Sequence, residues 1–205
     1  MPAKILRAIS ILSGVLYLFT GGVVLKGLAV GPLAVLAFVS ASPMLGAALA
    51  VSTLGDVLLD LDPEKLFVFG LGSFLLAHLI YLWTFIRNRT RPLALGVAQI
   101  VPTALVLVYS VSVSAWLLPS LGGLIVPVAI YMCAITAMVL SAILARFSNP
   151  WVAVGAILFL ISDSLLAINK FKTPVPLRDV LVWSTYYAGQ FAIANGFLAR
   201  QRSTR

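Results

Sequence analysis

Two aspartates, Asp56 and Asp163, lie inside apolar segments long enough to cross a lipid bilayer. Their surroundings are alike, because a pair of leucines follows each of them two and three residues later. A carboxylate in hydrocarbon is costly and is therefore rare unless it has a function. Acid and base catalysis, or the binding of protons and cations, are the chemistries that such a pair offers. The two aspartates are therefore the candidate site.

Both carboxyls should lie near one membrane face. Each aspartate comes late in its segment, and an even number of crossings separates the two segments, which therefore run in the same direction. Asp56 precedes Asp62 by six residues and Asp163 precedes Lys170 by seven. At 1.5 Å per residue, both carboxyls lie roughly 9–11 Å below the outer boundary. We expect them to converge in one water-poor chamber.

The composition predicts an integral membrane protein. The 205 residues are 61% hydrophobic and only 10% charged, with a mean hydropathy of +1.10, whereas soluble domains carry about 25% charged residues. The net charge of +8 does not indicate a nucleic-acid partner, because the basic residues cluster at the ends of apolar segments. Cys133 is the only cysteine, which excludes an intrachain disulfide.

The apolar segments predict an all-α fold. We expect one transmembrane domain over residues 1–205, an integral membrane bundle of eight transmembrane helices separated by short polar or proline-containing breaks. The predicted helices cover residues 4–20, 26–41, 43–61, 65–86, 92–114, 121–145, 150–169 and 177–199. Lys4 and Arg7 precede an apolar run as in a signal peptide, but no small-residue cleavage site follows, so we predict an uncleaved first helix.

The basic residues predict the orientation. With the N-terminus in the cytoplasm, nine of them fall on the inner side and five on the outer side, so both termini are expected to be cytoplasmic. The inner nine are Lys4, Arg7, Arg87, Arg89, Arg91, Arg146, Arg200, Arg202 and Arg205; the outer five are Lys26, Lys65, Lys170, Lys172 and Arg178.

The two Asp-x-Leu-Leu segments raise the hypothesis of a weak four-plus-four pseudo-repeat. They are 107 residues apart, and each ends a helix that a polar turn and another span follow. Duplicated halves are a common route to a membrane fold. Leucine-rich surroundings of a polar residue also arise by chance, so coincidence is the alternative.

Helical spacing places further polar side chains on shared faces. One stripe joins Asp56 to Ser52 and Asp60, four residues away on either side. A second stripe, in the last span, has intervals of four, three and four residues: Asp179, Trp183, Tyr186 and Gln190, with Tyr187 adjacent. Both stripes should face the interior of the bundle.

Three more residues are candidates for binding. Lys26 begins the second span, where its ammonium group can reach the carboxylates, and Tyr131 lies near the middle of the sixth span. His78 is the lone histidine, roughly 20 Å below the outer boundary.

Each of these features has a structural alternative. The aspartates can form a polar clamp between helices, His78 can be a satisfied core histidine, and Lys26 can extend to the lipid headgroups. Tyr81 and Trp83 can belong to an aromatic belt at the inner interface. The acidic residues after Leu59 are expected to form a solvated turn: Asp60, Asp62 and Glu64.

The sequence lacks the motifs of other hydrolase chemistries. It contains no His-Glu-x-x-His, no Gly-x-Ser-x-Gly, no glycine-rich phosphate loop and no cluster of Cys or His. We therefore expect no metal and no organic cofactor. Carboxylic acid chemistry remains.

A set of short strings, in order along about three quarters of the chain, resembles the YhhN-like lysoplasmalogenase family of multi-span membrane proteins. The strings are Leu54-Gly55-Asp56-Val57-Leu58-Leu59, Phe69-Gly70, Ala77-His78-Leu79-Ile80-Tyr81, Pro127-Val128-x-x-Tyr131-Met132, Gly155-Ala156-x-Leu158-Phe159-x-x-Ser162-Asp163, Asn169-Lys170-Phe171, Pro174-Val175-Pro176 and Ser184-Thr185-Tyr186-Tyr187-x-x-Gln190. Lys26-Gly27-Leu28 is similar to the family's Lys-Pro segment, with Gly27 where a proline is often seen.

The resemblance implies an eight-helix membrane hydrolase that acts on an ether bond. Its substrate would be a lysoplasmalogen, an alkenyl lysophospholipid, whose vinyl ether is cleaved to a fatty aldehyde and a glycerophospho-alcohol. That reaction needs one protonated acid and one carboxylate, and two carboxyls that share a site favour this division. We expect Asp56 and Asp163 to divide the two catalytic roles. Substrate binding would fall to Lys26 at the phosphate and to His78, Tyr131, Tyr186, Tyr187 and Gln190 near the glycerol or the water.

Three other functions remain open. A proton-coupled transporter or a lipid-handling channel would use the same aspartates to bind protons or cations. A purely structural bundle would need no site, and a related enzyme would cleave a lysophospholipid ester instead. The sequence favours the bacterial inner membrane, with the endoplasmic reticulum membrane as the alternative. It indicates a lysophospholipid and the bilayer as partners but no particular protein partner.

Overall fold

The computed structural model describes residues 2–89 and 96–203, the last four of these by backbone alone. This part of the chain forms eight α-helices and two single 3₁₀ turns, with no β-strand in it. The α-helices are α1 (Pro2–Thr20), α2 (Val23–Val39), α3 (Pro43–Leu61), α4 (Phe67–Arg87), α5 (Val97–Leu117), α6 (Ile125–Leu144), α7 (Trp151–Phe171) and α8 (Arg178–Ser203); the turns η1 (Leu118–Ser120) and η2 (Gly122–Leu124) join α5 to α6. The predicted all-α bundle is confirmed.

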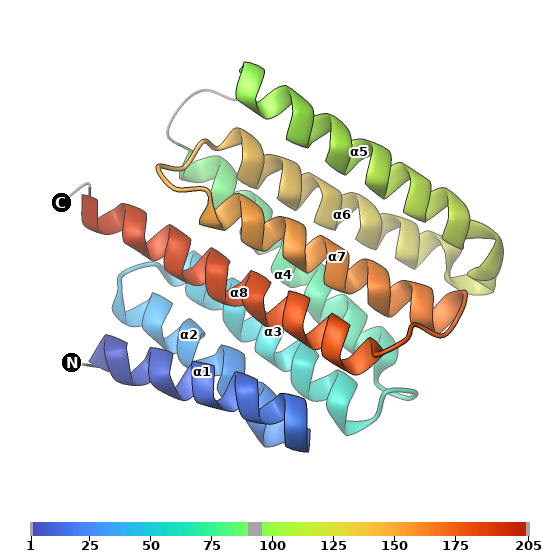
Figure 1. Ribbon diagram of the computed structural model, residues 1–205, viewed down its shortest axis with the longest axis horizontal. Helices are drawn as coiled ribbons and strands as arrows, with labels where there is room; N and C mark the ends of the chain where they lie inside the picture. The colour runs from blue at the N-terminus through green and yellow to red at the C-terminus, as the bar shows by residue number, and fades with distance from the viewer. Residues whose placement is uncertain (1, 90–95, 204–205) are drawn as a thin grey trace.

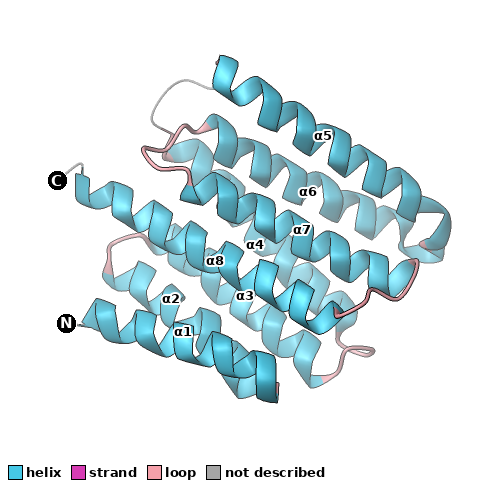
Figure 2. Ribbon diagram, in the orientation of Figure 1, coloured by secondary structure: helices cyan, strands magenta, loops and turns pink. Residues whose placement is uncertain are grey.

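The eight helices lie side by side in two layers (Figure 1). Helices α1, α8, α7 and α5 lie nearer the viewer, and α2, α3, α4 and α6 lie behind them. Short loops join consecutive helices over most of the chain (Figure 2). Extensive packing of α7 on α8 and of α3 on both α2 and α4 holds the layers, while α5 packs on α6 and α7 at one edge. The helices that carry the two aspartates, α3 and α7, are thus held on both sides by neighbours.

Six of the described helices are long and apolar enough to cross a membrane: α1, α3, α4, α5 with η1, α6 with η2, and α7. Helix α2 has 17 residues, at the lower end of the range of about 17–25 that spans a bilayer. Helix α8 has 26 residues, and its polar side chains Gln190 and Asn195 lower its hydropathy. Both lie alongside the other six (Figure 1), as a bundle of eight spans requires.

The helix boundaries follow the predicted spans within a few residues. Helix α2 starts at Val23, so that Lys26 lies in its first turn instead of at its start. The fifth span was expected from residue 92, but residues 92–95, like Arg91, lie outside the described part of the chain, and α5 begins at Val97. Helix α1 begins and α8 ends at the same end of the bundle (Figure 1), which agrees with an even number of spans.

Two glycines set the distance between α7 and α8. A Cβ atom at Gly155 would lie 2.6 Å from the carbonyl oxygen of Gly189 and 2.9 Å from the backbone nitrogen of Ile193. A Cβ atom at Gly189 would lie 2.8 Å from the carbonyl oxygen of Gly155. Such close backbone contact between membrane helices requires small residues. It fixes Asp163 on α7 relative to the polar stripe of α8.

We predict that Gly155→Ala destabilises the protein by about 1–3 kcal/mol, because the added methyl group meets backbone atoms that cannot move without separating the helices. Thermal unfolding of the purified protein in detergent measures the effect. Gly72→Ala on α4 is the matched control, since no heavy atom lies within 4 Å of a Cβ added there. If Gly155→Ala were as stable as Gly72→Ala, the close packing of α7 on α8 would be wrong.

Candidate active site

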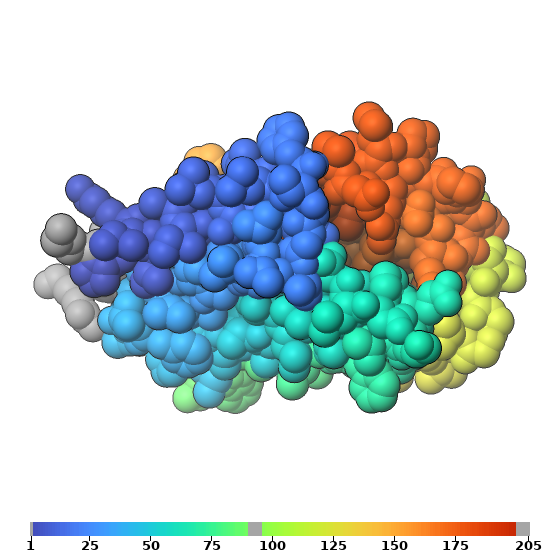
Figure 3. Space-filling model, turned by 90° about the horizontal axis from the view of Figure 1, so that it is seen from below, coloured from blue at the N-terminus to red at the C-terminus, as the bar shows by residue number. Residues whose placement is uncertain are grey.

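Asp56 and Asp163 line one pocket of about 420 Å³ that opens at the end of the bundle opposite the start of α1. We call it the aspartate pocket. Its walls come from α1, α2, α3, α4, α7 and α8, and its polar lining residues are Tyr17, Lys26, Asp56, Asp60, Ser162, Asp163, Arg178, Asp179, Trp183 and Tyr186. The surface is hollowed where the ends of α1 and α3 meet the start of α8 (Figure 3). The structure therefore brings the two predicted catalytic carboxyls to the same cavity.

A chain of hydrogen bonds from two other helices holds Asp56. Tyr186 on α8 donates its hydroxyl to Asp56 Oδ2 at 2.6 Å. Gln190 donates from Nε2 to the Tyr186 hydroxyl at 3.3 Å, and Tyr81 on α4 donates to Gln190 Oε1 at 2.6 Å. All four side chains are at least 96% buried. The network fixes Asp56 on the floor of the pocket, with the hydroxyl of Tyr186 directed at one of its oxygens.

Asp163 is held from the opposite side by α6 and α4. Tyr131 on α6 donates its hydroxyl to Asp163 Oδ2. His78 on α4 is fully buried, and its Nε2 lies 3.7 Å from the same oxygen, beyond hydrogen-bond distance. The imidazole packs edge-on against the ring of Tyr131, and neither of its nitrogens has a hydrogen-bond partner in the described residues. Tyr131 and His78 thus support Asp163 from behind, although the sequence estimate placed His78 about twice as deep as the aspartates.

The mouth of the pocket carries an ion pair that links α2 to α3. Lys26 Nζ lies 3.3 Å from Asp60 Oδ1, and the two side chains are only 16% and 19% exposed. Tyr17 on α1 donates its hydroxyl to the same oxygen at 2.7 Å, and the ammonium group also lies 5.4 Å from the centre of the Tyr17 ring. Lys26 therefore points toward the pocket, and the alternative in which it extends to the headgroups is wrong.

Arg178 supplies a second cation at the mouth and is a site residue that was not among the candidates predicted from the sequence. Its Nη1 pairs with the neighbouring Asp179, and its Nε has no hydrogen-bond partner in the described residues. Both residues line the pocket at the start of α8. The signal was present in the sequence, because Arg178 directly precedes the polar stripe of α8.

The acidic turn after α3 is only partly as expected. Asp60 is not solvated but belongs to the ion pair at the pocket. Asp62 does lie in an exposed turn, where the backbone N–H of Lys65, and next that of Glu64, donate to its carboxylate and hold the pKa of Asp62 below its ordinary value.

Three aromatic and amide side chains lie elsewhere than predicted. Tyr187 does not line the aspartate pocket, because its ring packs on Gly14 and its hydroxyl is 2.9 Å from Ser10 Oγ on α1. Gln190 lies behind Tyr186, and its amide bonds to two tyrosines instead of facing the cavity. Tyr81 is fully buried and hydrogen-bonded, so it is not part of an aromatic belt, whereas Trp83 is 53% exposed. Helical periodicity shows which residues share a face of a helix, but it does not show which neighbouring helix that face packs against.

The described residues contain no group of three or more His, Cys, Asp or Glu side chains placed to hold a metal ion. The polar groups that line the pocket are carboxyls, phenols, a hydroxyl, an indole, an ammonium and a guanidinium group. The pocket has two carboxyls at its base and two cations at its mouth, each of these cations paired with a further carboxylate. This arrangement suits a substrate that carries an anionic group a short distance from an acid-labile bond.

Comparison with known proteins decides the family. The model of the YhhN family matches residues 21–197. The chain belongs to the YhhN family. The resemblance noted from its short strings is thereby confirmed, and so is its character as a multi-pass membrane protein.

Three curated relatives of the chain share the name lysoplasmalogenase. A lysoplasmalogenase of Mycobacterium bovis is 37% identical over 153 residues, which are 73% of this chain and 58% of the relative. Lysoplasmalogenase TMEM86B of Sus scrofa is 35% identical over 75% of this chain and 62% of its own length. Lysoplasmalogenase TMEM86A of Homo sapiens is 34% identical over 71% of this chain and 61% of its own length. The chain thus spans about three fifths of the length of these relatives, and no solved structure matches it.

Proposed function

We propose that this protein is a lysoplasmalogenase, a membrane hydrolase that cleaves the vinyl ether bond of an alkenyl lysophospholipid. The observation that carries the proposal is the meeting of Asp56 and Asp163 at one pocket with Lys26 and Arg178 at its mouth. The names of the relatives support the same activity.

The two carboxyls divide the chemistry. One protonated carboxyl gives its proton to the alkenyl carbon next to the ether carbon, which leaves an oxocarbenium ion stabilised by the other, ionised carboxyl. That carboxylate takes a proton from a water molecule, and the resulting hydroxide adds to the ether carbon to form a hemiacetal. The first carboxyl, now ionised, takes the proton of the hemiacetal hydroxyl as the bond to the glycerol oxygen breaks. The second carboxyl gives the proton that it took from water to the glycerol oxygen, so the aldehyde is released and both carboxyls return to their starting states.

The remaining residues bind and position. Lys26 and Arg178 bind the phosphate at the mouth, since cationic donors to phosphate form short charge-assisted bonds. Tyr186 and Tyr131 orient the carboxyls through their hydroxyls, while Gln190 and His78 support these tyrosines and Asp163 without touching the substrate. Tyr187 has no part in the site that we propose.

The packing beneath Asp56 favours an enzyme over a transporter. The side chains of Tyr81, Phe85 and Gln190, farther along α4 and α8 from the mouth, are fully buried, and Tyr81 is hydrogen-bonded to Gln190. A path across the membrane would have to break this packing.

The basic residues support an orientation with both termini in the cytoplasm, so that the pocket opens on the opposite side. We propose the bacterial inner membrane as its location.

We predict that Asp56→Asn and Asp163→Asn each lower the rate of aldehyde release by about 10²–10⁴-fold, since each removes a general acid or base. The measurement uses purified protein with an alkenyl lysophospholipid and an aldehyde dehydrogenase that reports the product. Asp62→Asn is the control, because it makes the same change of charge in the exposed turn beside the site. If aldehyde release survived both substitutions, the aspartates would have no part in the reaction. If an ester substrate were cleaved faster than a vinyl ether of equal chain length, the bond that the enzyme cleaves would be the ester.

Lys26→Gln and Arg178→Gln should each raise KM about tenfold or more while kcat changes little, because a charged hydrogen bond to phosphate contributes about 1.5–3 kcal/mol. Steady-state kinetics with the same substrate measures both constants. Lys65→Gln, at the same end of the bundle and 86% exposed, should change neither. A fall in kcat at unchanged KM would assign these cations to catalysis instead of to binding.

A further inference from the structure

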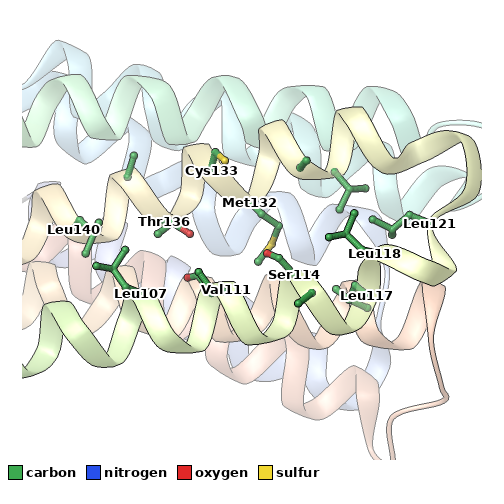
Figure 4. A pocket seen from close by; sticks show the side chains of 15 residues that line it. Leu107, Val111, Ser114, Leu117, Leu118, Leu121, Met132, Cys133, Thr136 and Leu140 are labelled. Atoms are coloured by element: carbon green, nitrogen blue, oxygen red, sulfur yellow. The ribbon is translucent and has the colours of Figure 1, made fainter.

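A second, larger pocket of about 520 Å³ lies between α5 and α6 (Figure 4). Its lining is apolar apart from a few small side chains, Ser110, Ser114, Cys133 and Thr136. On α6 it extends from Val128 to Leu140, which at 1.5 Å per residue is about 18 Å along the helix. The α5–α6 pocket is therefore long and hydrophobic, and its volume lies in the range of about 300–1,000 Å³ that small-molecule sites occupy.

A small third cavity, which we call the passage, has lining residues in common with both this pocket and the aspartate pocket. This cavity of about 30 Å³ shares four lining residues with the aspartate pocket: Leu59, Phe74, Asp163 and Leu166. At its other end the same cavity shares Val128 and Met132 with the α5–α6 pocket. The rest of its lining is hydrophobic apart from Tyr131. The three cavities form one series, with Asp163 at the point where polar lining gives way to hydrocarbon.

We propose that the alkenyl chain of the substrate passes Asp163, crosses this passage and lies in the α5–α6 pocket, which then sets the chain length that the enzyme prefers. The inference rests on the proposed function. It assigns one occupant to the α5–α6 pocket, the single hydrocarbon chain of the lysophospholipid.

The chemistry of the substrate requires this direction. A vinyl ether stands between the glycerophosphate headgroup and the chain, so a substrate with its phosphate at the mouth and its ether at the aspartates must send its chain beyond them. The passage is lined by Asp163 but not by Lys26 or Arg178, so it is the cavity that lies beyond Asp163 as seen from the mouth. The passage and the α5–α6 pocket offer the chain apolar contacts that a headgroup site alone cannot supply.

The passage must widen when the chain enters, because about 30 Å³ holds little more than one water molecule. Met132 stands at its junction with the α5–α6 pocket, and its unbranched thioether chain can change rotamer at low cost. Helix α5 forms one edge of the bundle (Figure 1) and packs mainly on α6. A small shift of α5 that makes room for the chain would therefore disturb few other contacts.

The test is the chain-length profile of Ser114→Phe, whose ring would fill the α5–α6 pocket from α5 (Figure 4). Two substrates with the same headgroup are compared, one with a sixteen-carbon and one with an eight-carbon alkenyl chain. The ratio kcat/KM for the long chain should fall about tenfold, because the ring takes space that the end of this chain needs, while that for the short chain stays unchanged. Ser112→Phe is the matched control, since Ser112 is exposed on the same helix and does not line the pocket.

A crosslinking readout tests the same assignment without catalysis. The probe is a saturated alkyl ether lysophospholipid, which has no vinyl bond to cleave, with a photoreactive diazirine at the end of its chain. Mass spectrometry should find the crosslinks on the pocket-lining parts of α5 and α6, and Lys26→Gln should reduce them because it weakens the hold on the headgroup.

The outcomes separate the two proposals. Equal loss for both chain lengths, or none, in Ser114→Phe would overturn the chain assignment while leaving the activity intact. Crosslinks that fall outside α5 and α6, or that Lys26→Gln leaves unchanged, would overturn it as well. Failure of the unaltered protein to release aldehyde from either substrate would instead overturn the proposed function, and the crosslinking result would then decide the chain site by itself.

Discussion

The structure depends on the cost of placing a carboxylate in a membrane. An acid in hydrocarbon must have a polar partner, and each aspartate receives a tyrosine hydroxyl from the opposite layer of the bundle, Asp56 from Tyr186 and Asp163 from Tyr131. These two bonds connect α3 to α8 and α7 to α6 across the interior. The same requirement that holds the helices together therefore creates a site in which two acids face one cavity.

The features that depend on amino-acid composition and on helical periodicity could be predicted from the sequence. Long apolar segments gave the helices, and proline and polar breaks gave their ends to within a few residues. The stripe of Ser52, Asp56 and Asp60 was expected to face inward, and the structure has Ser52 and Asp56 buried and Asp60 at the pocket. An intramembrane acid is so costly that Asp56 and Asp163 stood out without any structure. The four-plus-four pseudo-repeat stays a prediction.

What the sequence could not give is which helix faces meet. Tyr186 and Tyr187 are neighbours in the chain, yet one bonds to Asp56 and the other to Ser10. The rotation of α8 between α1 and α3 decides this, and the contact of Gly155 with Gly189 is part of what sets the packing of α8. The position of Asp60 opposite Lys26, and of His78 beside Asp163, likewise follows from packing across layers. The sequence pattern identifies the polar residues that face the interior. Only the tertiary contacts show which of them line the pocket and which of them support it.

The central claim is that the two carboxyls act as one unit on one substrate. A double-mutant cycle on the single-turnover rate of vinyl ether hydrolysis, built from Asp56→Asn, Asp163→Asn and the double variant, tests it most directly, because residues that act together show strongly non-additive losses. The account predicts that the double variant is no slower than the slower single variant, since either substitution alone already dismantles the pair. Losses that multiply in the double variant would show two independent groups and contradict the shared site.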